Sequence, residues 1–321
     1  MTMAATAGSG ARTGGMTGEE RKVIFASSLG TVFEWYDFYI YGTLGVFLAK
    51  YFFANVPPNV GFIFALLAFA AGFAVRPFGA LIFGRLGDMI GRKPIILAGF
   101  LLAALTYFPI FKGLTHFANP KLEAALNSAP VTVIADPNEC SFQFKATGTE
   151  KFTTSCDVAK SALVNLSVNY DNQSAPAGTK AQVKIGDQTL SADSPTFAKD
   201  LATAIKAHGY PASADPNDIN YVMTTVLLWI LVIYVTLVYA PIAAWLVELF
   251  PSRIRYSGMS LPYHIGNGWF GGFLPATVFA IAAATGNIYS GLWYPVGVAV
   301  TSLVIGFLFL PETKDVDITK T

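Results

Sequence analysis

Long apolar stretches constrain the fold of this 321-residue chain more than any other feature. A helix that crosses a bilayer needs about 20 mostly apolar residues. Six segments reach or approach that length, at residues 23–53, 60–83, 94–111, 221–249, 261–284 and 289–310. Only 13% of the residues are charged, whereas soluble proteins carry about 25%. The sequence therefore predicts an all-α membrane protein with six transmembrane helices.

The basic residues predict how the chain is oriented. In short loops, Lys and Arg collect on the cytoplasmic side of the membrane. With six spans, one side holds Arg12, Arg21, Lys22, Arg85, Arg92, Lys93, Arg253, Arg255, Lys314 and Lys320. We therefore expect two cytoplasmic tails, a disordered one at residues 1–20 and a short one at 312–321. Three membrane helices then occupy residues 21–112 and three more occupy 221–311.

The apolar pattern stops between residues 113 and 220, a segment that this orientation places outside the cytoplasm. Residues 131–135 are typical of a strand, residues 181–190 of a hairpin, and residues 197–208 of an amphipathic helix. We expect a small extracytoplasmic α+β domain inserted between membrane helices. Its sequence indicates no catalytic role, so a solvated insertion is the simplest interpretation.

The only two cysteines, Cys140 and Cys156, both lie in this polar segment. Disulfides form in oxidising compartments, which fits an extracytoplasmic location. Two unrelated buried thiols are the alternative. No histidine accompanies the cysteines closely enough to suggest a metal site.

Charged residues interrupt the first two apolar spans, notably Glu34, Asp37 and Arg76. Glu34 and Asp37 are three residues apart and share one helix face. A carboxylate at membrane depth must be paired, hydrated or protonated, and two neighbouring acids raise each other's pKa, so the pair could carry a proton. Arg76 cannot lose its proton and needs a carboxylate or an anionic substrate. The alternatives are lipid headgroups for the acids and a side chain that reaches the cytoplasmic surface for Arg76.

The loop at residues 84–93 carries the most specific pattern of the chain. It combines three glycines with an acid and three bases: Gly84, Gly87 and Gly91, Asp88, and Arg85, Arg92 and Lys93. The glycines allow close helix approach and tight turns. Asp88 is expected to begin the next helical segment, cap it and pair with an arginine. Such a charged loop could act as a latch between conformations. A generic basic loop would explain the charges, but not the glycines or the aspartate.

This loop, with the pattern Gly-x-x-x-Asp-x-x-Gly-Arg-Lys from Gly84 to Lys93, resembles the signature loop of the major facilitator superfamily. The sequences around Glu34-Trp35-Tyr36-Asp37 and Val75-Arg76-Pro77 are similar to its metabolite:proton symporter branch, which moves shikimate, α-ketoglutarate, citrate, proline and betaine. Residues 247–258 and the ending Pro311-Glu312-Thr313-Lys314 resemble later parts of the same family. The resemblance implies proton-coupled symport by alternating access in the bacterial inner membrane. It also implies proton and substrate roles for Glu34, Asp37 and Arg76.

One departure from the family concerns the number of helices. The resemblance implies twelve helices in two halves, with substrate bound between them, but this sequence has room for six. It reads as helices one and two joined to helices nine to twelve, with the large insertion between nine and ten. Two copies could pair to rebuild a twelve-helix transporter. Alternatively, the chain is a non-transporting, internally deleted remnant, or a membrane-tethered module that displays a periplasmic binding domain.

Further polar residues lie in the last three spans. His264 and Asn267 could relay protons or contact substrate, or could instead hold helices together among glycines. Glu248, with Arg253 and Arg255, repeats the latch pattern in the second half. No pattern of the sequence indicates an enzyme, a cofactor, a metal or a nucleic-acid partner; the expected partners are a small metabolite, protons and the lipid bilayer.

Overall fold

The computed structural model describes residues 77–318 apart from 146, 148–150 and 212–213. The first predicted span and most of the second lie outside the described residues, together with Glu34, Asp37 and Arg76. The end of the second span forms a helix at residues 77–90.

Four described helices are long and apolar enough to cross a membrane. The first two are α4 (Arg92–Ala118) and α8 (Tyr221–Leu249). The third consists of α9 (Arg255–His264), the π-helix η2 (Ile265–Gly271) and α10 (Leu274–Thr285). The fourth consists of η3 (Ser290–Leu292) and α11 (Trp293–Phe309). The bounds of α8 agree with the predicted span at residues 221–249. By contrast, α4 continues seven residues beyond the predicted end at 111.

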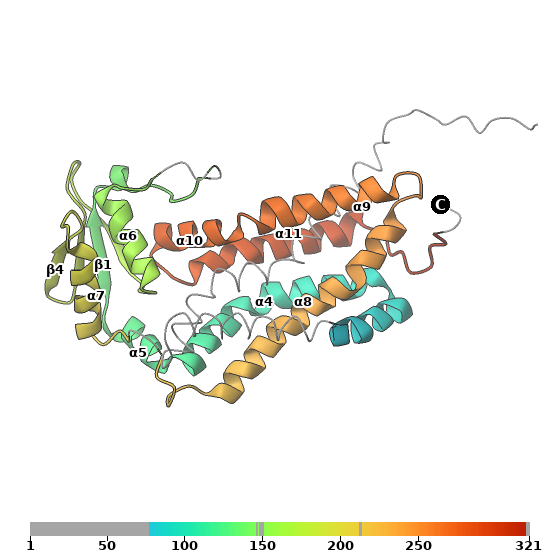
Figure 1. Ribbon diagram of the computed structural model, residues 1–321, viewed down its shortest axis with the longest axis horizontal. Helices are drawn as coiled ribbons and strands as arrows, with labels where there is room; N and C mark the ends of the chain where they lie inside the picture. Colours follow the sequence, from blue (N-terminus) through green and yellow to red (C-terminus); the bar gives the residue numbers. More distant parts are fainter. Residues whose placement is uncertain (1–76, 146, 148–150, 212–213, 319–321) are drawn as a thin grey trace, which may run out of the picture.

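These helices pack side by side as an elongated bundle, with α4 against both α8 and α11 (Figure 1). Small residues let membrane helices approach closely, and Gly99 does this here. A Cβ atom at Gly99 would lie 2.7 Å from Val238 Cγ2 of α8. The buried core between the helices contains Phe100, Tyr107 and Trp245.

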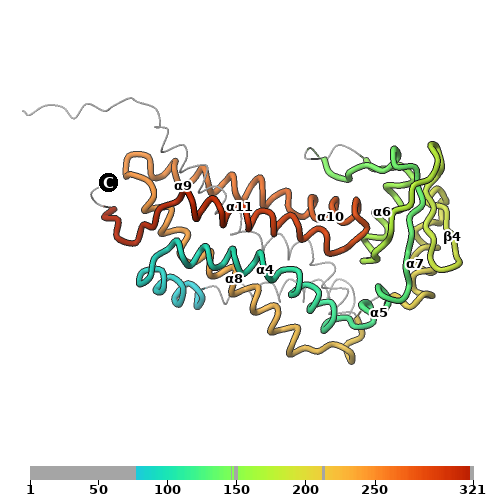
Figure 2. Tube along the Cα trace, turned by 180° about the vertical axis from the view of Figure 1, so that it is seen from behind, coloured from blue at the N-terminus to red at the C-terminus, as the bar shows by residue number. Residues whose placement is uncertain are grey.

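At one end of the bundle, residues 120–210 form a separate layer, which we call the α+β region (Figure 2). Its helices are α5 (Pro120–Ser128), η1 (Pro137–Glu139), α6 (Ser155–Asn165) and α7 (Phe197–Ala207), and its strands are β1 (Val131–Ala135), β2 (Asp171–Ser174), β3 (Gln182–Ile185) and β4 (Gln188–Ser191). The sheet order is β2-β1-β3-β4, with β1 and β2 parallel and the other pairs antiparallel. The predicted strand, hairpin and amphipathic helix are all present.

The core of the α+β region is apolar and reaches into the bundle. Alternate residues of β1 and β3 are buried, as the two-residue period of a strand requires. Their core also contains Leu163 of α6 and Leu201 of α7, and it extends to Ala282 and Ala283 of α10. The predicted disulfide between Cys140 and Cys156 is present and joins the end of η1 to the start of α6.

Hydrogen bonds tie the α+β region to α10 and to the loop that follows it. The Tyr170 hydroxyl donates to the Ala283 carbonyl, and the Tyr170 amide donates to the Gly286 carbonyl at 2.8 Å. The Ile288 amide also donates to Asn169 Oδ1 at 2.9 Å. The α+β region is therefore attached to the bundle by more than its two chain connections.

Candidate conformational latch

The helix at residues 77–90 meets α4 at Gly91, which lies at the opposite end of the bundle from the α+β region (Figure 1). Gly91 has φ +114°, a backbone conformation that favours glycine. Asp88 lies in the last turn of the first of these helices. The prediction that Asp88 begins and caps the next helical segment is therefore wrong, because the chain turns three residues later.

The residue that caps α4 is Glu312, from the segment after α11. Its carboxylate accepts hydrogen bonds from the Arg92 amide at 2.9 Å and the Lys93 amide at 3.0 Å. The first N–H groups of a helix lack partners within the helix, and the helix dipole favours a negative charge there. A Cβ atom on Gly91 would lie 2.3 Å from the Glu312 carboxylate, so only glycine leaves room for this contact.

Glu312 also accepts hydrogen bonds from the amides of Thr313 and Lys314, at 2.9 and 3.0 Å. Partial desolvation raises the pKa of Glu312, but the four backbone donors outweigh it and hold this pKa below its usual value. The carboxylate is therefore charged at neutral pH and complements the helix terminus.

Arg92 lies at the centre of the contacts at this end of the bundle. Its guanidinium lies 2.9 Å from both Asp88 Oδ1 and Glu248 Oε1, and donates to the Gly87 carbonyl at 2.9 Å. The side chains of Arg92 and Glu248 are only 11% and 12% exposed, whereas that of Asp88 is 70% exposed. The inner pair is therefore shielded from water and the outer pair is not.

Glu248 connects Arg92 to the C-terminal segment. Its second carboxylate oxygen accepts from the Thr313 hydroxyl at 2.6 Å, and Thr313 is buried. Nearby, Trp245 Nε1 donates to the Pro311 carbonyl at 3.1 Å. We call Asp88, Arg92, Glu248, Glu312 and Thr313 the Arg92 cluster. It joins the end of the helix at residues 77–90 and the start of α4 to the end of α8 and the segment after α11.

Lys93 adds a second contact with α11. Its Nζ donates to the carbonyls of Phe307 and Leu310, at 2.9 and 2.7 Å. A cation at a helix C-terminus complements the helix dipole. The start of α4 and the end of α11 thus cap each other.

The other predicted latch residues lie at the same end of the bundle but outside the Arg92 cluster. Arg85 is exposed, and a Cβ atom on Gly84 would meet nothing within 4 Å. Arg255 donates to the Phe250 and Ile318 carbonyls, at 3.1 and 3.2 Å. Arg253 lies in the turn between α8 and α9. The two predicted latches are therefore connected, because Glu248 of the second pairs with Arg92 of the first.

His264 and Asn267 have different environments. His264 ends α9 and is exposed, whereas Asn267 lies on the π-helix η2 and is buried. Within the part of the chain that the structure describes, both polar atoms of the Asn267 amide lack a hydrogen-bond partner. π-Helical turns often occur at functional sites, so the structure singles out Asn267 of this pair.

Among the described residues, no group of three or more His, Cys, Asp or Glu side chains is arranged to hold a metal ion. Sequence reasoning did not assign Glu312 or Thr313 to the latch. The ending Pro311-Glu312-Thr313-Lys314 carries a family resemblance, but no local pattern indicates what Glu312 contacts. The helix terminus that Glu312 caps, at Arg92 and Lys93, lies more than 200 residues earlier in the sequence.

Comparison with known proteins identifies what this chain resembles. The family model described as "Sugar (and other) transporter" matches residues 22–124 and 201–321. A stretch of 93 residues is 42% identical to the proline/betaine transporter of Salmonella typhimurium and covers 29% of this chain and 19% of that protein. A stretch of 78 residues is 40% identical to the shikimate transporter of Escherichia coli and covers 24% of this chain and 18% of that protein.

Each of these alignments spans less than a fifth of the relative's length. No solved structure matches the chain. The matched family and these relatives are transporters, not enzymes, in agreement with the prediction from the sequence.

Proposed function

Because the chain belongs to the sugar (and other) transporter family of the major facilitator superfamily, we propose that it is a secondary active transporter. It couples the symport of a small organic acid or a zwitterionic metabolite to protons, through alternating access. The names of the relatives, which include proline/betaine and shikimate transporters, support a small metabolite as the substrate. They favour transport over a non-transporting remnant or a membrane-tethered binding module.

The Arg92 cluster is the observation that carries this proposal. Alternating access requires one end of a bundle to open while the other closes. The cluster holds three segments together through Arg92, Glu248 and Glu312, and these segments can separate only if the contacts break. Charged groups can exchange such partners for water, so the cluster suits a reversible latch.

The proposed orientation follows from the two ends of the bundle. The Arg92 cluster and the basic loops occupy one end, which we assign to the cytoplasm together with both termini. The α+β region, within residues 113–220, occupies the other end, which we assign to the extracytoplasmic side of a bacterial inner membrane. The Cys140–Cys156 disulfide supports this assignment, since disulfides persist in oxidising compartments. The two stretches that match the family model flank residues 125–200 and support an insertion there.

Proton coupling and substrate contact are assigned to polar residues in the predicted spans. Glu34, Asp37 and Arg76 are the candidates from the first two spans, and His264 and Asn267 are those from the span formed by α9, η2 and α10. The buried amide of Asn267 supports a substrate contact, because a buried polar group without a partner costs stability unless a ligand completes it. Six spans from one chain would supply one half of a central cavity, so we propose a homodimer as the transporting unit.

Uptake into proteoliposomes tests this function. Purified protein would be reconstituted with an imposed pH gradient, and uptake of radiolabelled proline, betaine and shikimate would be measured. We expect uptake of at least one substrate that collapses when the gradient is dissipated. Asp37→Asn should abolish it, whereas Asp193→Asn, at an exposed site in the α+β region, should not. Uptake that persists in Asp37→Asn, or a folded protein that takes up none of these metabolites, would contradict the proposal.

The proposed homodimer is tested by measuring the molecular mass of the detergent-solubilised protein.

A further inference from the structure

The third membrane span changes its helical form partway along its length. It begins as α9 at the end of the bundle that holds the Arg92 cluster, which we call the Arg92 end, and finishes as α10 beside the α+β region (Figure 1). Where the π-helix η2 ends, the Gly272 amide donates to the Asn267 carbonyl at 3.0 Å, a bond across five residues instead of four. Regular α-helical bonding returns with the Phe273 amide, which donates to the Trp269 carbonyl at 3.2 Å. The span is therefore two α-helices joined by a wider turn.

The residues of this turn are poor at keeping a helix straight. Gly266, Gly268, Gly271 and Gly272 all fall between residues 266 and 272, and glycine favours a helix about fivefold less than alanine does. Pro275 follows at the start of α10 and has no N–H with which to continue the hydrogen-bond ladder. Prolines and π-turns are usual sites of sharp helix kinks. The segment therefore combines several features that let a helix bend.

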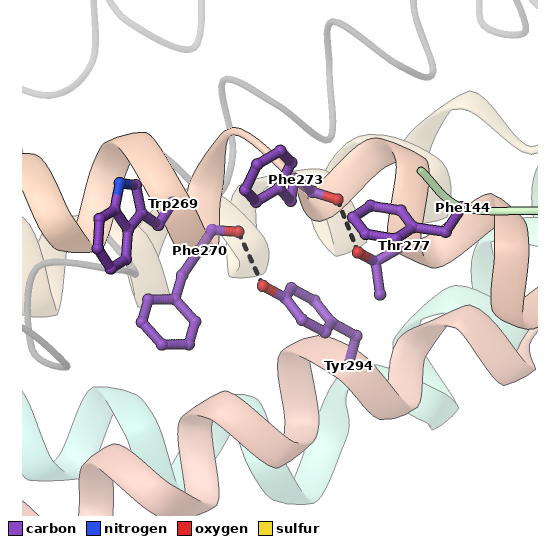
Figure 3. Close-up of a pocket in the computed structure, with 6 residues that line it drawn as sticks. All are labelled: Phe144, Trp269, Phe270, Phe273, Thr277 and Tyr294. Atoms are coloured by element: carbon purple, nitrogen blue, oxygen red, sulfur yellow. Dashed lines mark hydrogen bonds between the residues drawn. The ribbon is translucent and has the colours of Figure 1, made fainter. Parts of the chain in front are cut away.

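The backbone of this turn needs glycine at one position and has open space at another. A Cβ atom on Gly272 would lie 2.3 Å from the Gly268 carbonyl oxygen, so the path of the chain excludes a side chain there. A Cβ atom on Gly268 would meet nothing within 4 Å among the described residues. A hollow of about 520 Å³, lined in part by Trp269, Phe270 and Phe273, also borders η2 (Figure 3). This side of η2 can therefore move without displacing a packed core.

One contact holds the centre of η2 against the neighbouring span. The Tyr294 hydroxyl of α11 donates to the Phe270 carbonyl at 2.9 Å (Figure 3). Irregular backbone within a membrane is tolerated where neighbouring helices satisfy its polar groups, and this bond does so for η2. It also fixes a point about which the rest of the span can turn.

The α10 half of the span is fixed to the α+β region. The Tyr170 hydroxyl donates to the Ala283 carbonyl, and the Tyr170 amide donates to the Gly286 carbonyl at 2.8 Å. Ala282 and Ala283 are part of the apolar core of the α+β region. Displacement of α10 would therefore require that core to open.

The α9 half is attached to the Arg92 end instead. Arg255, its first residue, donates to the Phe250 carbonyl at the end of α8 and to the Ile318 carbonyl of the C-terminal segment, at 3.1 and 3.2 Å. A Cβ atom on Gly258 would lie 2.6 Å from the Phe250 ring, so α9 is in close contact with the end of α8. The end of α8 also carries Glu248 of the Arg92 cluster. Separation of the segments that this cluster joins would therefore carry α9 with it.

We propose that η2 is a hinge, about which α9 bends relative to α10 when the Arg92 end opens. The bend lets one half of the span follow the latch while the other half stays on the α+β region. The purpose of such a hinge depends on the proposed alternating access, but the bend itself is measured without substrate. A span that bends in a protein that takes up no metabolite would contradict the proposed transport alone. A span that keeps one shape in a protein that transports would contradict the hinge alone.

Distances between two spin labels measure the bend. Tyr256→Cys and Ala284→Cys place labels at exposed positions near the two ends of the span, and both native cysteines are already paired in the disulfide. A straight helix would separate these two backbone positions by about 42 Å. Val222→Cys and Tyr239→Cys, on a continuous part of α8, form the reference pair.

Double electron–electron resonance would be recorded for both pairs in lipid nanodiscs. Because a hinge samples more than one angle, we expect a distance distribution about twofold wider across η2 than along α8, or one with two peaks. Equal widths for the two pairs would overturn the hinge.

Two glycines of the membrane helices provide a matched pair of variants. Gly268→Ala adds a methyl group where the described residues leave space, so it should not distort η2. Because alanine favours a regular helix about fivefold more than glycine does, the bent population should fall by about that factor. Gly297→Ala in α11 is the control, since a Cβ atom there also meets none of the described residues within 4 Å. A bent population unaffected by Gly268→Ala, or reduced equally by Gly297→Ala, would overturn the hinge.

A third variant tests the connection between the hinge and the latch. Glu312→Gln removes the charge that caps α4 but keeps the size of the side chain. A charge at a helix N-terminus favours the capped state by about twofold to fivefold, so the bent population should rise by a similar factor. Circular dichroism would establish that each labelled variant is folded. A bent population that stays the same or falls in folded Glu312→Gln would overturn the proposal.

Discussion

The two ends of this molecule are held together in different ways. The Arg92 cluster is a polar network whose contacts join segments up to 220 residues apart. The α+β region is held by a continuous apolar core, a sheet and a disulfide between residues 16 positions apart. Ion pairs can exchange partners with water, whereas an apolar core loses its stabilisation when it opens. From this difference we propose that the Arg92 end opens reversibly while the α+β end stays closed.

The largest expected effect is that of Arg92→Ala. This change leaves Glu248, whose side chain is only 12% exposed, without its cationic partner. Removal of one partner from a buried ion pair costs about 3–5 kcal/mol. Thermal unfolding in detergent should show a marked loss of stability.

Arg85→Ala provides the matched control for that change, because Arg85 is an exposed arginine of the same loop. It should leave the unfolding temperature nearly unchanged. Equal losses from the two substitutions would show that the loop depends on total positive charge and not on the Arg92 contacts.

The next effect concerns the other end of the molecule. Replacement of Cys140 and Cys156 by serine removes a crosslink across 16 residues, which stabilises a fold by about 3 kcal/mol. We expect faster hydrogen exchange in α6 and β1 and unchanged exchange at the start of α4. Increased exchange at both ends would contradict the independence of the two regions.

A smaller effect is expected for Gly91→Ala. The positive φ of Gly91, with ψ 155°, costs a residue with a side chain about 1–3 kcal/mol, and the new methyl group would displace Glu312. Gly84→Ala is the control, since a Cβ atom there meets nothing within 4 Å. Unfolding temperatures measured in parallel should fall only for Gly91→Ala, and an equal fall in both would remove the argument for the Glu312 contact.

The smallest effect is the pH dependence that Glu312 contributes. Its pKa is lower in the folded protein than in an unfolded chain, so its stabilising effect is complete above the ordinary glutamate pKa of about 4.3. This contribution is lost as the pH falls through the lower, folded-state pKa. Glu312→Gln should therefore reduce the unfolding temperature at pH 7 and have little effect at the acid end of a titration. A pH-independent difference between the variants would contradict this role.

The sequence predicted the local structure better than the long-range contacts. The apolar length of α8 and the alternation in β1 are local patterns, and both elements have the predicted bounds. The end of α4 was placed too early because Lys112 and His116 interrupt the apolar pattern, although the helix continues through them. Glu312 could not be assigned from the sequence, since its role as a helix cap exists only when α11 brings it to Gly91.

The most direct test of the latch is the accessibility of Leu310, which is 3% exposed and accepts a hydrogen bond from Lys93, the neighbour of Arg92 in the chain. Leu310→Cys introduces a thiol, and both native cysteines are already paired in the disulfide. A membrane-impermeant maleimide would be applied to inside-out vesicles. We predict slow labelling of Leu310→Cys alone and labelling that is faster by about tenfold or more when Arg92→Ala is added. Equal labelling rates in the two proteins would contradict the claim that the Arg92 cluster closes this end of the bundle.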